Sequence, residues 1–238
     1  MIRFCFYVSF LTLLSLYSQE IEERKEKNEI ALGINLNTHA SILGGVDLFY
    51  YRTKNDKKQN GFVLEFVNIK HPKEISVQSS VNNSASYTYG KFNHLATLRT
   101  LFSKKFLLFH KNAEEGVELT LNTSLGPLWG LQKPYYVFVQ NDPNFGSDYY
   151  KYSSLPDTVP IAGKGGFFRG FSEAKLVPGL GGRLSGMLDF NQESSTPMGI
   201  EVGTQIDAYS KGIEILAYEK PKKYFFTAFV VFYMGIRW

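Results

Sequence analysis

Apolar and polar residues alternate along most of the chain with a period of two. In residues 30–37, Ile30, Leu32, Ile34 and Leu36 alternate with small or polar residues. Successive side chains of a β-strand point to opposite faces, so this spacing predicts a strand with one apolar and one polar face. The alternation recurs in residues 62–67, 117–122, 180–190, 200–207 and 224–238, and less regularly in residues 43–53 and 90–109. The pattern predicts an all-β fold, a closed antiparallel up-and-down transmembrane barrel of about eight strands, with about ten also compatible.

The predicted connections between strands differ in length on the two sides of the barrel. The second, fourth and sixth connections, residues 54–60, 110–116 and 191–199, are short to moderate and contain turn-forming residues. The third and fifth connections, residues 71–88 and 134–173, are much longer, although the first, residues 39–45, is short. An even number of strands with short turns on one side and long loops on the other is typical of outer-membrane barrels.

The first 18 residues, MIRFCFYVSFLTLLSLYS, predict a cleaved signal peptide. Arg3 is followed by an apolar run to Leu16 and by the small residue Ser18. An N-terminal membrane helix is the alternative, but the run is shorter than the roughly 20 residues that span a bilayer. Residues 19–29 form a mixed charge run, predicted as a solvated periplasmic arm, and residues 30–238 are predicted to form the barrel domain.

Composition excludes several other classes of protein. Cys5 is the only cysteine and lies in the predicted signal, so the mature chain has neither disulfides nor a thiolate metal site. The chain has 26 Lys and Arg; without Arg3, 25 face 22 Asp and Glu, an excess too small to indicate nucleic-acid binding. No metal site or cofactor is predicted.

Alternation alone does not distinguish a membrane barrel from a soluble barrel of the lipocalin kind, whose apolar face points inward. Three features favour the membrane barrel: the export signal, the aromatic residues near both ends of residues 224–238, and the mixture of glycine with isolated charges on the other face. An eight-strand barrel is just wide enough for side chains to fill, so we expect opposite charges to pair inside and to close the lumen. The predicted lumen charges are Glu65, Arg99, Glu118, Arg183, Asp189, Glu201, Asp207 and Arg237.

Four short segments resemble a known group of proteins. KHPKE (70–74), YTYGK (87–91), LQKPYY (131–136) and MGIRW (234–238) are similar to small, mostly uncharacterised outer-membrane β-barrel proteins of Bacteroidota. The resemblance implies the outer membrane of a Gram-negative bacterium and, by extension, an accessory subunit of a larger outer-membrane assembly. The terminal Trp238 resembles the signal by which barrel-assembly machinery recognises its substrates for insertion.

The long connections supply a candidate interaction surface. In KHPKE, the lysines either meet lipopolysaccharide phosphates or begin a solvated loop. The aromatic residues of 134–173 either face a partner protein or a surface glycan, or cover the barrel mouth, with YYVFV (135–139) and GGFFRGF (165–171) as a hairpin. The candidate residues are Lys70, His71, Lys73, Tyr135, Tyr136, Tyr149, Tyr150, Phe167, Phe168 and Arg169.

The sequence predicts a non-enzymatic barrel that presents its outer loops. A lipid A- or phospholipid-modifying enzyme is the first alternative, and a narrow solute pore is the second. Catalysis needs a nucleophile beside a base, but His39, His71, His94 and His110 lie near different strand ends, and no serine stands beside one in a recognisable motif. His94 is the single catalytic candidate that we retain.

Overall fold

The computed structural model describes residues 28–40, 44–55, 58–82, 84–109, 117–156, 158–190 and 195–238. The predicted signal peptide, residues 19–27 of the predicted arm, and His110 lie outside the described residues. No helix in the described part of the chain is both long enough and apolar enough to cross a membrane.

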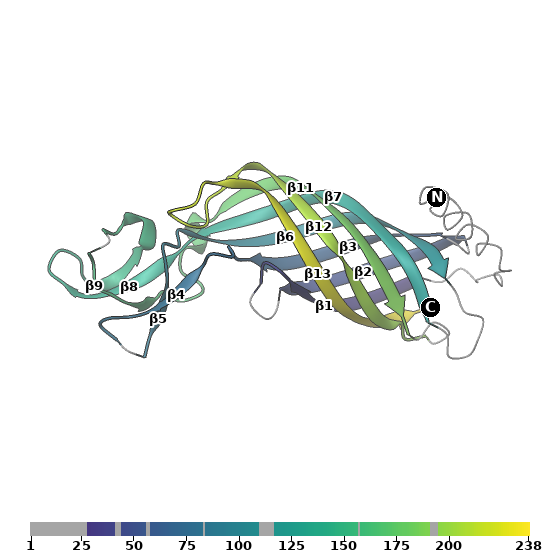
Figure 1. Ribbon diagram of the computed structural model, residues 1–238, viewed down its shortest axis with the longest axis horizontal. Helices are drawn as coiled ribbons and strands as arrows, with labels where there is room; N and C mark the ends of the chain where they lie inside the picture. Colours follow the sequence, from purple (N-terminus) through teal and green to yellow (C-terminus); the bar gives the residue numbers. More distant parts are fainter. Residues whose placement is uncertain are drawn as a thin grey trace, which may run out of the picture.

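Eight antiparallel strands close into a barrel (Figure 1). They are β1 (Asn28–Asn37), β2 (Gly45–Asn55), β3 (Lys58–Ile69), β6 (Asn93–Phe109), β7 (Glu118–Pro134), β11 (Lys175–Asp189), β12 (Met198–Ile213) and β13 (Lys222–Arg237). Each strand pairs with its neighbours along the chain, and β13 returns to pair with β1 from Glu29↔Arg237 to Asn37↔Phe229. Closure leaves the barrel without an edge strand. The predicted fold class and the count of eight strands are therefore confirmed.

Two strand limits differ from the sequence-based expectation. β1 begins at Asn28, so Glu29 belongs to the barrel and not to the charged arm. The strand is thus two residues longer than expected at its N-terminal end. The Glu29 side chain points inward and forms ion pairs with Lys105 and Arg237. The connection between β2 and β3 is also shorter than residues 54–60, because β2 continues to Asn55 and β3 begins at Lys58.

The two faces of the barrel have the reverse of the polarity of a soluble protein. Outward side chains are apolar and exposed, for example Leu32 at 61% and Leu125 at 67% of their full exposure. Inward side chains include Glu65, Glu201 and Arg183, all buried. The burial pattern of β3 from Gly61 onward alternates at every residue, as period two requires. In these strands the charged side chains thus lie on the buried face of the barrel wall and the apolar ones on the exposed face.

The long connections gather at one end of the barrel, here called the loop end, and Trp238 lies at the other (Figure 1). At the loop end, residues 70–92 and 135–174 fold together into a loop unit with its own small sheets. One sheet has the order β10-β8-β9, and the other pairs β4 with β5. Their bounds are β4 (Ile75–Gln78), β5 (Ser86–Tyr89), β8 (Tyr136–Asp142), β9 (Gly146–Lys151) and β10 (Ile161–Lys164), with short 3-10 helices η1 (Tyr152–Ser154) and η2 (Phe171–Glu173).

The loop unit has a conventional apolar core. Tyr135, Val137, Tyr152 and Ile161 are buried against one another. Two backbone N–H groups of residues 70–92 donate to tyrosine hydroxyls of residues 135–174: Thr88 to Tyr135 and Gly90 to Tyr152, each at 3.0 Å. The two long connections are thereby fastened together.

The alternative in which YYVFV and GGFFRGF form a hairpin over the barrel mouth is wrong. β8 contains most of YYVFV, but its partners are β9 and β10. GGFFRGF instead forms a turn and the start of η2, because Gly170 adopts φ +82°, a left-handed conformation that favours glycine and interrupts an extended strand.

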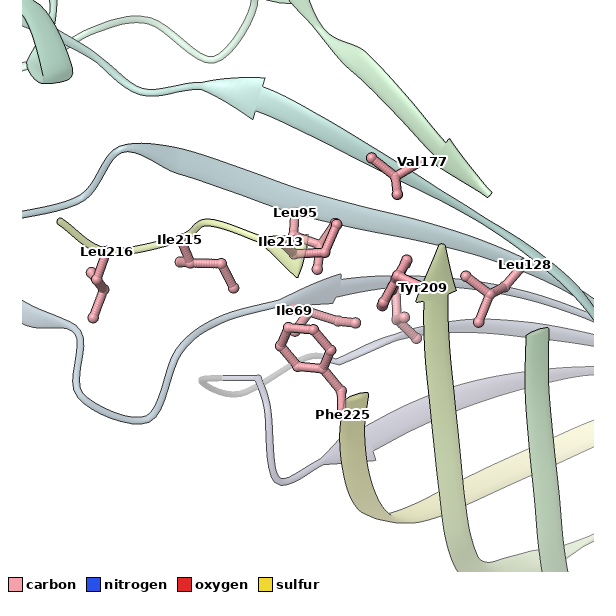
Figure 2. Packing of buried hydrophobic residues seen from close by; sticks show 10 residues of the cluster. Ile69, Leu95, Leu128, Val177, Tyr209, Ile213, Ile215, Leu216 and Phe225 are labelled. Carbon is pink, nitrogen blue, oxygen red and sulfur yellow. The ribbon is translucent and has the colours of Figure 1, made fainter. Parts of the chain in front are cut away.

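A buried apolar cluster lies where the barrel opens at the loop end (Figure 2). Residues 214–221, here called the mouth segment, supply Ile215 and Leu216, which pack with Tyr209, Phe225 and other strand residues. The N–H of Phe92 donates to the carbonyl of Ile215, at 2.8 Å, and fixes the mouth segment to the loop unit. The loop end of the barrel is consequently covered by apolar side chains.

Candidate functional site

The middle of the lumen contains an ion-pair cluster centred on Arg183. Its guanidinium contacts Asp47 at 3.0 Å, Glu65 at 3.3 Å and Glu201 at 2.6 Å. Arg183 is on β11 and Asp47 is on β2, strands that are not neighbours in the barrel. The side chain therefore reaches across the lumen and links opposite walls.

A second guanidinium extends this cluster. Arg99 contacts Glu65 at 2.8 Å and Asp207 at 2.5 Å. Strand register brings these groups together, since Asp47 is paired with Glu65 and Glu65 with Arg99 on adjacent strands. Neutral donors supply further hydrogen bonds, among them the Asn35 side-chain amide, which donates to Glu65 at 2.9 Å.

A separate cluster lies near the chain terminus. Arg237 bridges Glu29 at 2.9 Å and Asp189 at 2.8 Å, and Lys105 contacts Glu29 at 3.3 Å. The Lys105 ammonium also lies 3.5 Å from the centre of the Tyr51 ring. Glu118, the remaining predicted lumen charge, is buried as well.

Sequence reasoning missed three members of these clusters: Glu29, Asp47 and Lys105. Glu29 falls in the predicted arm, and Asp47 falls in the irregular segment 43–53. Lys105 follows Lys104, and only the parity of β6 distinguishes the buried lysine from the exposed one. A signal for Glu29 was present in the sequence: the alternation of residues 30–37, extended by one residue toward the N-terminus, places Glu29 on the polar face.

Breaking a buried ion pair leaves an uncompensated charge, which costs several kcal/mol, although the intact pair adds little net stability. The lumen groups therefore hold one another in fixed positions. Arg183 also lies with its guanidinium carbon 4.0 Å from the centre of the Phe229 ring, so charges and aromatic rings interleave. These groups and the apolar cluster at the loop end both occupy the interior of the barrel.

Polar contacts tie the loop unit to the mouth segment. Lys91, almost fully buried, pairs with Glu74 at 2.7 Å, and exposed Lys73 pairs with Glu219 at 2.5 Å. The ring of His71 lies 3.0 Å from the Lys222 ammonium. Burial lowers the pKa of His71 below its ordinary value, and the Lys222 charge lowers that pKa further. Burial likewise lowers the pKa of Lys91, against the opposing effect of Glu74.

The predicted outer-loop surface is only partly exposed. Tyr135 and His71 are buried, so their assignment to the surface is wrong. Tyr135 has the same parity as inward Val137 and packs on Tyr152, with ring centres 6.2 Å apart. Lys70, Tyr136, Tyr149 and Tyr150 are half-buried, and Lys73, Phe167, Phe168 and Arg169 are exposed.

The exposed part forms an aromatic patch, defined as Phe167, Phe168, Arg169 and Phe171. The three rings contact one another with centres 5.3 to 6.3 Å apart. Behind them, the Lys133 ammonium lies 4.6 Å from the ring centres of both Phe167 and Phe171 and donates to the Phe167 carbonyl. Arg169 lies with its guanidinium carbon 3.7 Å from the centre of the Tyr149 ring. The patch is thus exposed and also held in place.

The remaining candidates do not assemble a catalytic group. His94 is half-buried with its ring edge against Tyr135, 5.2 Å between ring centres. Within the described residues it forms no hydrogen bond, and no three His, Cys, Asp or Glu side chains are arranged to hold a metal ion. Trp238 is 60% exposed, and its backbone pairs with that of Asn28.

Comparison with known proteins yields likeness of fold only. No family model and no curated protein matches the chain. The chain is similar in fold to two structures of Ail, the attachment invasion locus protein of Yersinia pestis. The matched regions cover 90% of this chain and 100% of the Ail chain, with 10% and 11% identity and TM-scores of 0.41 and 0.42. The first is a complex with the heparin analogue sucrose octasulfate. Neisserial surface protein A covers 91% of this chain and 97% of its own, with 8% identity and a TM-score of 0.38. Similarity at this level supports no inference about function.

Proposed function

We propose that this chain is an outer-membrane barrel of a Gram-negative bacterium, of the small Bacteroidota type. In this proposal a signal peptide exports the chain, and the filled lumen makes the barrel a rigid support for the loop unit. The reversed polarity of the barrel carries the proposal. Exposed apolar residues such as Leu125, Leu184 and Val202 surround it, while charged residues lie inside. Water does not stabilise such an exterior, whereas lipid chains do.

A spin label at residue 202 tests the membrane location. We expect the label at 202 to be accessible to oxygen, which dissolves in lipid, and protected from an aqueous nickel reagent. A label at Phe168, 81% exposed on the loop unit, should show the opposite accessibility. Equal access of the nickel reagent to both labels would exclude the membrane location.

The filled lumen argues against the pore alternative. Arg183 and Arg99 link opposite parts of the wall through buried carboxylates, and Ile215 and Leu216 cover the loop end. In planar bilayers, the purified protein should therefore give no steady conductance. A stable open-channel current would refute this part of the proposal.

The aromatic patch is the surface that we propose for a partner. Aromatic rings and arginine dominate the centres of protein interfaces. Because Lys133 and Tyr149 already hold the patch residues in place, little ordering would accompany binding. We propose a protein partner, such as another subunit of an outer-membrane complex, with a surface glycan as the competing occupant. Barrel-assembly machinery is a further partner during insertion, with Trp238 as the recognition signal.

Site-specific photo-crosslinking in intact cells tests this role. A crosslinker at Phe168 should capture one discrete partner protein, and the triple variant Phe167→Ala, Arg169→Ala and Phe171→Ala in the same chain should reduce the yield severalfold. A crosslinker at Ile75, 64% exposed on the same unit but outside the patch, is the matched control. Equal capture at both positions, or a glycan adduct instead of a protein, would contradict a specific protein site.

A further inference from the structure

The wall of the barrel opens sideways between β11 and β12 at the loop end. Pairing of β11 with β12 ends at Gly179↔Tyr209. Each strand nevertheless continues. β11 stays paired with β7 as far as Lys175↔Gln132, and β12 pairs with β13 to Ala208↔Tyr224 and, after an irregularity, again at Ile213↔Lys222. The two strands therefore diverge above Gly179 and leave a lateral notch.

A pocket of about 580 Å³ occupies this notch. Such a volume lies within the range of about 300–1,000 Å³ that is usual for small-molecule sites. Leu176 and Val177 line it from β11, Lys211 and Gly212 line it from β12, and the loop unit contributes Lys151. The pocket is thus bounded by barrel strands below and by the loop unit above.

The pocket carries cations that the protein does not neutralise. Lys151, Lys175 and Lys211 line it together with the carboxylates of Glu173 and Glu214. Lys151 and Glu173 pair with each other. Lys175 and Lys211 are both exposed, and within the described residues neither ammonium makes a hydrogen bond or an ion pair. Lys175 and Lys211 therefore line the pocket with one remaining carboxylate, that of Glu214, so the excess of positive charge favours an anion.

The notch also lies at the upper limit of the apolar exterior. Leu176 in its wall is 61% exposed, and Leu180 and Ile206, just below the point where the strands separate, are 63% and 53% exposed. Above them, exposed residues include Lys175, Lys211 and Lys223. A ligand in the pocket would therefore place its polar groups near Lys175 and Lys211. Its apolar groups would lie along the exposed side chains of Leu176, Leu180 and Ile206.

We propose that the notch binds the phosphate-bearing headgroup of a membrane lipid, with Lys175 and Lys211 contacting the phosphate. Lysine ammonium groups bind phosphate as compact point charges. The acyl chains of the same lipid extend along the outward face of β11 and β12. This inference rests on the membrane location proposed above, and it adds a specific site and a ligand class to it.

Native mass spectrometry of the full chain, released from vesicles, tests the site. The vesicles contain phosphatidylcholine with a minor fraction of phosphatidic acid. We expect one phosphatidic acid to be retained in preference to phosphatidylcholine. The double variant Lys175→Gln and Lys211→Gln should weaken retention about tenfold, equivalent to about 1.4 kcal/mol. Lys164→Gln, at an exposed lysine on β10 outside the pocket, is the matched control and should leave retention unchanged.

The outcomes separate this inference from the proposed membrane location. If the protein inserts into vesicles but retains both lipids equally, or if Lys164→Gln reduces retention as much as the double variant, the site is refuted and the location stands. Failure to insert into any vesicle refutes both. Displacement of the lipid by millimolar inorganic phosphate would assign the pocket to the free anion instead. The variant Lys175→Arg with Lys211→Arg should restore retention, which excludes misfolding as the cause of a loss.

Discussion

The lumen buries charged side chains among apolar ones, whereas the core of the loop unit is apolar. In the lumen, Arg183 and Arg99 lie among carboxylates, whereas the core of the loop unit consists of Tyr135, Val137, Tyr152 and Ile161. The lumen is enclosed by a sheet whose closure satisfies the backbone, so its side chains need only satisfy one another. The loop unit has no such wall and depends on apolar burial in the manner of a small soluble domain. The chain therefore contains two regions that are stabilised in different ways and that contact each other at the loop end of the barrel.

The largest expected effect comes from removing the charge at the centre of the lumen. Arg183→Met leaves Asp47, Glu65 and Glu201 without their shared cation, so we expect the free energy of unfolding to fall by about 3–5 kcal/mol. The change is measured by urea titration of the barrel in detergent. The folded fraction at each urea concentration is read from the difference in electrophoretic mobility between unheated and heated samples. Arg52→Met, at an exposed arginine on β2, is the control and should change stability by less than about 0.5 kcal/mol. Similar losses in both variants would show that the network is not the cause.

The second effect separates the two regions. Tyr152→Ala removes a buried ring from the loop-unit core and the hydroxyl that accepts from the Gly90 N–H, at a local cost of about 3 kcal/mol. Hydrogen exchange in β8 and β9 should accelerate, while exchange in β6 and β7 stays unchanged. Phe168→Ala truncates an exposed ring of the same unit and should have little effect on either. Faster exchange throughout the barrel strands would mean that the two regions fold as one unit.

The same contrast explains which features the sequence could predict. In the barrel, parity along a strand places Arg183 and Glu201 on the face opposite to the apolar residues, and the predicted export signal and the aromatic strand ends favoured that face as the inner one. In the loop unit, burial depends on contacts between segments about 60 residues apart, such as Gly90 with Tyr152, which no local pattern encodes. Tyr135 therefore looked like a surface aromatic although it is a core residue. The notch between β11 and β12 was equally hidden, because it depends on where two strand pairings end.

The smallest effect concerns the junction between the two regions and depends on pH. The His71 ring contacts Lys222 from β13 and accepts from the Lys73 N–H, with Glu74 and Glu219 nearby. Because burial lowers its pKa below 6.5 in the folded protein, an opened mouth segment takes up the proton first as pH falls through 6.5. The closed junction is thus fully stable above that pH and weakens below it. Between pH 7.5 and 5.5, hydrogen exchange in residues 214–221, corrected for its intrinsic pH dependence, should rise by no more than about tenfold, because only one pH unit of this window lies below 6.5. His71→Gln should abolish this rise, and a rise that persists in the variant would assign the pH dependence to another group, such as His39.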